Sequence, residues 1–204
     1  MNTSPDEGPL SSVILTMPQK DCRINIDNVF GTRKKPLEVD IGCGKGRLLL
    51  ARAEADPEIN FLGIDRVSSR IEKIARRAAR RGLTNIRLLR ADAFQAVESF
   101  LPLSSVSVFY IFFPDPWPKR RHFKRRLFTE SFAHSLLRAT HPGGRVHIAT
   151  DHSDYFDLIE KIMENEGEFE RIEPYIPSEN ERTNFEMVFL GINQTVNRCS
   201  FRKI

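Results

Sequence analysis

Three aspartates and two glycines have the residue types and the spacing of a ligand-binding site. Asp40 precedes Gly42 and Gly44 in a Gly-x-Gly-x-Gly turn, and Asp65 and Asp92 follow at similar intervals along the chain. Glycines at such a turn let a ligand approach the backbone closely. The spacing differs from the Gly-x-Gly-x-x-Gly of a dinucleotide site, and Asp40 would repel a pyrophosphate. The three acids instead predict a ligand with a ribose, an adenine and a cationic amino-acid end.

Residues 113–126 combine an acid, an indole and a dense cationic run. Three prolines hold Asp115 and Trp117 between them, and six of the eight residues 119–126 are Lys or Arg. Because proline fixes φ and removes a backbone donor, we expect a stiff loop at the end of a strand. The loop would suit a nucleobase held near a phosphate backbone, whereas the simpler alternative is a solvated basic helix start. Trp117 is either a stacking partner for a base or a hydrophobic plug under the loop.

Short apolar runs alternate with amphipathic stretches along the chain. The predicted strands are residues 37–41, 60–65, 85–90, 106–113, 145–150, 169–172 and 196–201. The predicted helices are residues 48–55, 68–81, 93–100, 125–140 and 153–165. This alternation predicts an α/β fold with a doubly wound, mostly parallel seven-stranded sheet and helices on both faces. Ligands of such sheets bind outside the carboxyl ends of the strands, so the three acids would line one crevice.

The chain reads as one domain. We expect residues 1–36 to be a flexible tail, over residues 1–12, and a lead-in segment, and residues 37–204 to form a single domain. The first nine residues are polar and acidic, and no apolar stretch approaches the ~20 residues that a membrane helix needs. We therefore expect a cytoplasmic protein that does not bind membranes.

The charge distribution and the cysteine spacing indicate which kinds of ligand the chain binds. The net charge of the 204 residues is +4, and the basic residues are clustered. A second cluster is a solvated helix face or an extension of a phosphate-contacting track, and its members are Arg76, Arg77, Arg80 and Arg81. Cys22, Cys43 and Cys199 lack any Cys-x-x-Cys spacing, so we expect reduced thiols and no metal site.

Two levels of resemblance follow from these residues. The turn at Gly42 with the acids that follow it resembles the S-adenosylmethionine site of Rossmann-like class I methyltransferases. Three further strings make the resemblance narrower: Pro-Asp-Pro-Trp-Pro-Lys-Arg-Arg-His at 114–122, Ala-Thr-Asp at 149–151 and Thr-Asn-Phe-Glu at 183–186. Over about residues 37–204 the chain resembles the bacterial single-subunit tRNA (guanine-N(7)-)-methyltransferases.

The resemblance implies a role for particular residues. Cofactor contacts fall on Asp40, Asp65, Asp92 and Asp115, and Asp115 is implied to be catalytic. Substrate contacts fall on Lys119, Asp151, Thr183, Asn184, Phe185 and Glu186. Asp40 and Asp65 stand where family members often have Glu, which shortens each reach by one methylene and predicts a small geometric adjustment.

The implied reaction is transfer of a methyl group from S-adenosyl-L-methionine to N7 of a guanine in tRNA. The product is S-adenosyl-L-homocysteine, no metal is implied, and the family implies the variable loop of the tRNA, position 46, as the target. We expect a monomer or homodimer without an obligatory protein subunit. Two alternatives stay open: the same chemistry on a ribosomal RNA, a protein or a small molecule, or a catalytically silent RNA-binding module on this fold.

Overall fold

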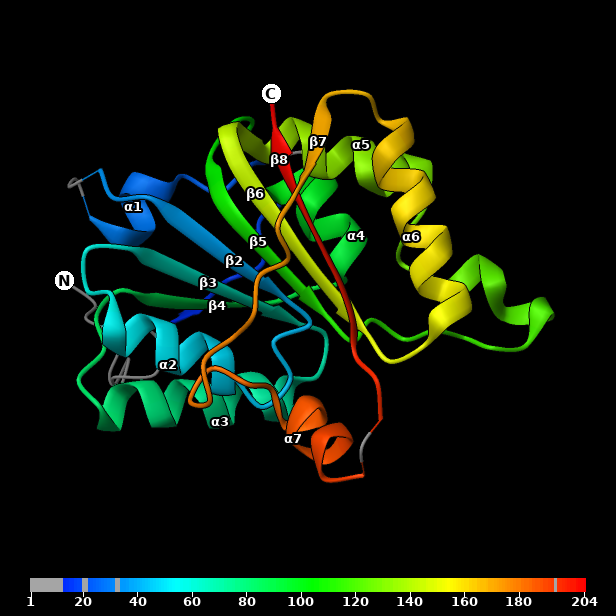
Figure 1. Cartoon of the computed structure of the whole chain (residues 1–204). Coiled ribbons are helices and arrows are strands. Elements are labelled where there is room, and N and C mark those ends of the chain that lie inside the picture. Colours follow the sequence, from blue (N-terminus) through cyan, green and yellow to red (C-terminus); the bar gives the residue numbers. More distant parts are fainter. Residues whose placement is uncertain (1–12, 20–21, 32–33, 193) are drawn as a thin grey trace, which may run out of the picture.

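The computed structural model describes residues 13–19, 22–31, 34–192 and 194–204 of the chain. Its centre is an eight-stranded sheet with the strand order β1-β4-β3-β2-β5-β6-β8-β7 (Figure 1). The strands are β1 (Ile14–Leu15), β2 (Leu37–Ile41), β3 (Asn60–Asp65), β4 (Ile86–Arg90), β5 (Val106–Phe112), β6 (Thr140–Thr150), β7 (Phe169–Ile172) and β8 (Asn197–Lys203). Strands β1 to β6 pair in parallel, whereas β8 runs antiparallel to both β6 and β7.

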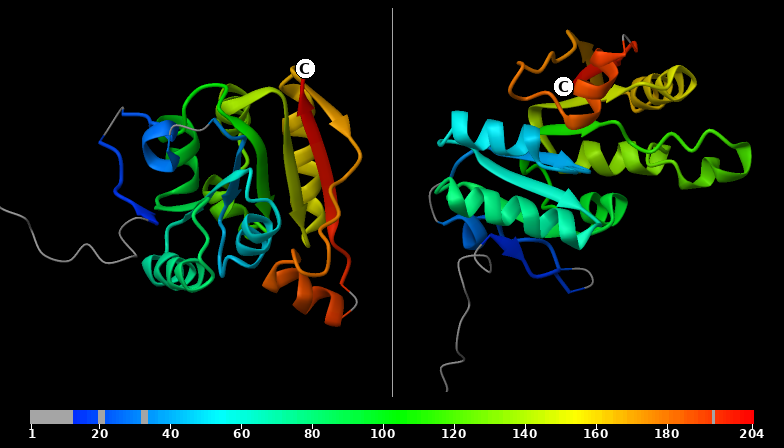
Figure 2. Two further views of the ribbon diagram at one scale, coloured as in Figure 1. Left: turned by 90° about the vertical axis from the view of Figure 1, so that its left-hand side faces the viewer. Right: turned by 90° about the horizontal axis from the view of Figure 1, so that it is seen from below.

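Helices cover both faces of the sheet (Figures 1 and 2). The α-helices are α1 (Ile26–Phe30), α2 (Arg47–Ala55), α3 (Ser68–Arg80), α4 (Ala93–Gln95), α5 (Glu130–Ala139), α6 (Ser153–Asn165) and α7 (Asn184–Gly191). A π-helical turn, η1 (Ala96–Phe100), continues α4, and a 3₁₀-helix, η2 (Arg120–Arg125), precedes α5.

Alternate side chains of each central strand face opposite layers. Val39 of β2 and Phe109 of β5 pack against η1, α5 and α6 in the larger core. Phe61 of β3 and Leu88 of β4 pack against α2 and α3 on the other face. This two-sided burial explains why the parallel strands read as continuous apolar runs.

The predicted fold is confirmed, with one correction to the strand number. Seven strands were predicted, and the described residues form eight, because β1 pairs with β4 through Ile14 and Leu15. Two residues are too few to show the period-2 pattern of a strand. Residues 1–12, predicted as a flexible tail, lie outside the described residues. The domain boundary at residue 36 stays a prediction.

Helix boundaries were less accurate after residue 113. One helix was predicted over residues 125–140, whereas the structure has η2 and then α5, which starts at Glu130. Thr129 is the N-cap, since its Oγ1 accepts a hydrogen bond from Phe132 N at 3.2 Å. The cap therefore decides where the helix begins. The last parallel strand begins at Thr140, five residues before the predicted start.

Candidate active site at the carboxyl edge of the sheet

Five parallel strands end at the same edge of the sheet. From β2 the chain continues to β3 and β4 on one side, and later to β5 and β6 on the other. The strand order therefore reverses at β2, and the carboxyl end of β2 is the topological switch point. Open α/β sheets bind their ligands in the crevice at such a point. The edge is the lower end of the sheet in Figure 1, where α7 lies.

The glycine turn connects β2 to α2 at this switch point. The amides of Gly42 and Cys43 both donate to the carbonyl of Ile64, at 2.8 and 3.0 Å, which fixes the turn to β3. Gly42 has a φ of +73°, and a Cβ at this position would meet no atom within 4 Å, so the backbone is open to a ligand. Gly46 serves packing instead, because a Cβ there would lie 2.7 Å from Cγ1 of Ile74 in α3.

Asp40 is a buried carboxylate next to this turn. Only 6% of the residue is exposed, and its carboxyl group makes no hydrogen bond or ion pair with any described residue. Burial, and then the negative charge of Asp65, raise the pKa of Asp40 to about 7. The pKa of Cys43 is raised first by burial and then by the negative charges of Asp40 and Asp65. The structure therefore brings Asp40 and Asp65 together around the turn. A cationic or hydrogen-bond-donating ligand would stabilise the ionised form of Asp40.

Asp65 is held by the backbone at the end of β3. Its Oδ2 accepts from Gly44 N at 3.0 Å and lies 3.3 Å from Nη1 of Arg70, while its Oδ1 accepts from Val67 N at 2.8 Å. A carboxylate has about four lone-pair sites. Oδ1 therefore keeps acceptor capacity for a ligand.

Asp92 lies beyond β4 and is exposed. Its Oδ1 caps α4 by accepting from Gln95 N at 3.2 Å. No contact joins Asp92 to Asp40 or Asp65 among the described residues. The shared strand edge is therefore what relates Asp92 to the crevice.

The loop after β5 is strained and packs on itself. Phe113 and Trp117 both have a positive φ, at +56° and +43°, which non-glycine residues rarely adopt. The Trp117 ring lies edge-on to His122, 5.6 Å between centroids, and the guanidinium of Arg125 lies 4.9 Å from its centroid. In the structure Trp117 thus packs within its own loop.

Arg126 differs from the other basic residues of 119–126, because it does not face the solvent. It is buried, and its Nε donates to the carbonyl of Pro116 at 2.8 Å. Its guanidinium also lies over the rings of Phe123 and Tyr155, at 3.9 and 4.7 Å. Arg126 therefore anchors the loop to α6. The exposed cations of the loop are Lys119, Arg120, Arg121, Lys124 and Arg125.

Asp115 and Lys119 are both exposed on this loop. Asp115 makes no hydrogen bond or ion pair with the described residues. The pKa of Tyr155 is raised, chiefly by burial and in small part by the charge of Asp115, which places Asp115 near α6. At the end of the next strand, Asp151 accepts a hydrogen bond from Nε2 of Gln194 at 3.3 Å.

The C-terminal segment brings its predicted substrate residues to the same edge. Thr183 is the N-cap of α7, with its Oγ1 accepting from Glu186 N at 3.1 Å. Phe185 is 58% exposed, and its ring lies 6.1 Å from that of Phe113 at the end of β5. Glu186 is buried and pairs with Arg198 of β8, whereas its Oε2 has no partner among the described residues. Asn184, the remaining member of this run, is exposed.

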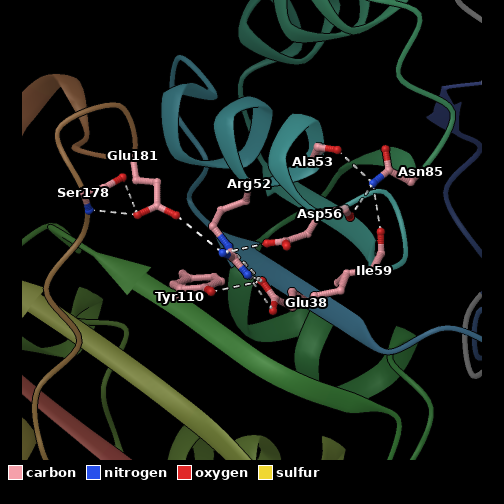
Figure 3. A network of polar contacts seen from close by, with 9 residues as sticks. All are labelled: Glu38, Arg52, Ala53, Asp56, Ile59, Asn85, Tyr110, Ser178 and Glu181. Carbon is pink, nitrogen blue, oxygen red and sulfur yellow. Dashed lines mark hydrogen bonds and ion pairs between the residues drawn. The ribbon is translucent and has the colours of Figure 1, made fainter.

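A partly buried ionic network attaches the segment before α7 to the sheet (Figure 3). Arg52 of α2 pairs with Glu38 of β2 at 3.1 Å, with Asp56 at 2.8 Å and with Glu181 at 3.5 Å. Tyr110 of β5 donates to Glu38 at 3.0 Å. Sequence reasoning missed this network. Its available signal was Glu38, a charged residue on the same strand face as Asp40 in a buried strand.

Two kinds of feature do not occur in the described part of the chain. No group of three or more His, Cys, Asp or Glu side chains there is arranged to hold a metal ion. No helix among those residues has the length and the apolar character needed to cross a membrane. All three cysteines are free thiols.

Comparison with known sequences gives one consistent result. A family described as "Putative methyltransferase" matches residues 34–197. A tRNA (guanine-N(7)-)-methyltransferase of Rubrobacter xylanophilus is 41% identical over 72% of this chain and 66% of its own length. One of Chromohalobacter salexigens is 36% identical over 80% of this chain and 69% of its own length. The chain spans between about half and about two thirds of the length of the curated relatives that it matches.

Solved structures share the fold at low sequence identity. The 16S rRNA methyltransferase KamB has a TM-score of 0.63 at 17% identity, over 87% of this chain and 92% of its own. A putative methyltransferase of Streptococcus mutans in complex with SAH has a TM-score of 0.54 at 12% identity, over 84% of this chain and 90% of its own. Likeness at these identities establishes the methyltransferase fold alone.

Proposed function

Because this chain belongs to the family of tRNA (guanine-N(7)-)-methyltransferases, we propose that it transfers a methyl group from S-adenosyl-L-methionine to N7 of a guanine in tRNA. The target is a guanine of the variable loop, at tRNA position 46, and the other product is S-adenosyl-L-homocysteine. The observation that carries the proposal is the pairing of two sites at one sheet edge. Two acids, Asp40 and Asp65, lie at the ends of β2 and β3, and a cationic loop begins at the end of β5.

The residues of the crevice fit the cofactor. Asp40 is a buried acid whose carboxyl group has no partner among the described residues, which suits the ammonium group or the ribose hydroxyls of the ligand. Gly42 and Gly44 leave the backbone open, Asp65 offers Oδ1 to a ribose hydroxyl, and Asp92 accepts from the adenine amino group. When bound, the cofactor supplies an electrophilic methyl group on a sulfonium sulfur. No step of the proposed reaction uses a metal ion.

Guanine N7 needs positioning more than it needs a base. N7 has a lone pair and no proton, so a carbon–nitrogen bond can form as the carbon–sulfur bond breaks without proton removal. Alignment of nucleophile and methyl group can contribute on the order of 7–11 kcal/mol to the rate. The guanine becomes cationic during transfer, and the Asp115 carboxylate would stabilise that charge. Asp115 also accepts from guanine N1–H and the N2 amine, or from the methionyl ammonium.

The substrate-binding set surrounds this edge. Lys119 and the exposed cations that follow it would contact phosphates of the tRNA. Thr183, Asn184, Phe185 and Glu186 at the start of α7, with Asp151 after β6, would contact the target nucleotide. Glu186 retains a free acceptor in Oε2 even though it pairs with Arg198.

We further propose that the enzyme acts in the cytoplasm on tRNA, with no membrane association. It needs no obligatory protein subunit and acts as a monomer or homodimer. Residues 37–204 would form the methyltransferase domain, preceded by a tail and lead-in segment over residues 1–36.

Methyl transfer from a labelled donor tests the substrate class. The purified chain is incubated with labelled S-adenosyl-L-methionine and, in separate reactions, with unmodified tRNA, ribosomal RNA or bulk protein. We expect incorporation into tRNA alone. Incorporation into another acceptor would identify a different substrate on the same cofactor site, and no incorporation into any acceptor would favour a silent RNA-binding module.

A further inference from the structure

A groove of about 630 Å³ lies between α2, the end of α3 and the segment that leads into α7. Its polar lining residues are Lys45, Arg47, Glu54, Arg77, Arg81, Asn180 and Asn184. None of the four acids at the carboxyl edge lines it. The groove is therefore separate from the proposed cofactor crevice, although Lys45 belongs to the same glycine turn.

The groove has an excess of positive charge. Four of its lining residues are cations, and its one anion, Glu54, is already paired with Arg81 at 2.8 Å. The pKa of Arg77 is lowered, first by burial and then by the charges of Arg81 and Arg80, so its neighbouring cations repel it. A wall of this charge favours an anionic ligand.

Two of the guanidinium groups are held in place by the backbone. Nη1 of Arg77 donates to the carbonyl of Lys45 at 2.7 Å, and Nη2 of Arg47 donates to the carbonyl of Glu179 at 3.1 Å. The Nε of Arg47 is buried and has no hydrogen-bond partner among the described residues. A buried donor without a partner is destabilising, so an anionic oxygen at this position would be stabilising.

The groove also adjoins the segment proposed to bind the substrate. Asn184 lines it and is the first residue of α7, whose next residue, Phe185, contacts Phe113 at the end of β5. Figure 1 shows α3 on one side of the molecule and residues 113–126 projecting from the other side. A large polyanion that spans the carboxyl edge of the sheet can contact both cationic surfaces.

We propose that this groove binds the phosphate backbone of the RNA substrate, as a second contact surface in addition to residues 119–126. The inference rests on the proposed function for the identity of the RNA. It also divides the four arginines of residues 76–81, at the end of α3: Arg77 and Arg81, four residues apart, line the groove, whereas Arg76 and Arg80 do not.

This division supplies a matched pair of variants. Arg77→Gln/Arg81→Gln removes two groove cations, and Arg76→Gln/Arg80→Gln removes two cations from the neighbouring face of the same helix. For each we would measure affinity for unmodified tRNA against salt concentration, affinity for S-adenosyl-L-homocysteine, and kcat at saturating tRNA. The groove variant should bind tRNA roughly tenfold more weakly at low salt, with a slope of log affinity against log salt about two units shallower. Its cofactor affinity and kcat should stay unchanged, and the control should resemble the wild type.

A second variant guards against loss of folding. If Arg77→Gln/Arg81→Gln melts below the assay temperature, Lys45→Gln is used, because its side chain has no hydrogen bond or ion pair with the described residues. It should make the slope shallower by about one unit.

Equal effects of the groove and control variants on tRNA binding would contradict the proposal that the groove binds RNA. If the wild type transfers no methyl group to tRNA, the proposed function fails instead. The groove would then still stand if its variants alone weakened RNA binding.

Discussion

At the residue scale, the buried carboxylate of Asp40 sets a pH dependence for cofactor binding. Because its pKa is raised to about 7 in the free protein, Asp40 is largely protonated below that pH. A ligand that binds the ionised form must first displace the proton. We expect the affinity for S-adenosyl-L-homocysteine to fall by up to about tenfold per pH unit below 7. Calorimetric titration over about pH 5.5–8, a range that spans the transition, measures this affinity. The affinity of Asp40→Asn should not change with pH over that range.

The raised pKa of Asp40 also makes the stability of the folded protein depend on pH. The pKa of Asp40 rises from 3.8 to about 7 on folding, so the folded state binds more protons between these values. The contribution of Asp40 to stability is present below pH 3.8 and is lost as the pH rises towards 7, by up to about 4 kcal/mol. The difference in the free energy of unfolding between Asp40→Asn and wild type, measured in urea, should therefore grow in favour of the variant over this range. A difference that does not change with pH would contradict a raised pKa.

Asp115 is the residue on which the proposed chemistry depends. Asp115→Asn keeps the size of the side chain and removes its charge, so it should slow single-turnover methyl transfer by roughly 10²–10³-fold. Affinity for S-adenosyl-L-homocysteine should change far less. Asp157→Asn, an exposed substitution on α6, is the control and should leave the rate unchanged. An unaffected rate in Asp115→Asn would remove Asp115 from the catalytic role.

At the element scale, Arg52 fixes the segment before α7 against α2 and β2. Replacing it leaves the buried Glu38 without this counter-ion and with the hydrogen bond from Tyr110, so Arg52→Met should cost up to roughly 3–5 kcal/mol in the free energy of unfolding. The double variant Glu38→Gln/Arg52→Met should recover part of this loss. Urea unfolding measures both. Arg81→Met, which breaks the exposed pair with Glu54, should cost only about 0–1 kcal/mol.

Arg52→Met should also affect tRNA binding more than cofactor binding. Since the segment that Arg52 holds leads into Thr183 and α7, we expect Arg52→Met to raise KM for tRNA more than it lowers the affinity for S-adenosyl-L-homocysteine. A parallel loss of both would indicate general unfolding and would contradict a positioning role for Arg52.

Elements with clear signals at both ends could be predicted from the sequence. β2, β3 and α6 have the predicted bounds, because apolar runs stop at Gly42 and Asp65 and a polar cap opens α6. α7 was missed because its residues are apolar on most sides and show no amphipathic period. The inward turn of Arg126 could not be predicted either, since it depends on Tyr155, which is distant in sequence.

The candidate site also has parts that could be predicted from the sequence and parts that could not. Asp40 and Asp65 could be placed together because parallel strands share a carboxyl edge. The Glu38–Arg52–Glu181 network and the groove of Arg77 and Arg81 join residues far apart in the chain, and only the folded structure brings them together.

At the scale of the whole molecule, tRNA binding should depend strongly on salt. The exposed cations of residues 119–125 number five and are available to phosphate. If these five cations neutralise about five phosphates, they alone should contribute roughly −3.5 to −4.5 to the slope of log affinity against log salt, and the groove cations should make the total slope steeper. Filter binding over a range of potassium chloride concentrations measures the slope. An affinity that does not change with salt would contradict an electrostatic tRNA surface.

The most direct measurement is a map of the methylated atom. Unmodified tRNA is incubated with the enzyme and S-adenosyl-L-methionine, then treated with borohydride and aniline, which cleave the strand at 7-methylguanine. We expect scission at a single guanine in the variable loop, which is absent in the Asp115→Asn reaction stopped at the same time. Methyl incorporation without scission would place the methyl group on another atom and contradict guanine N7 as the acceptor.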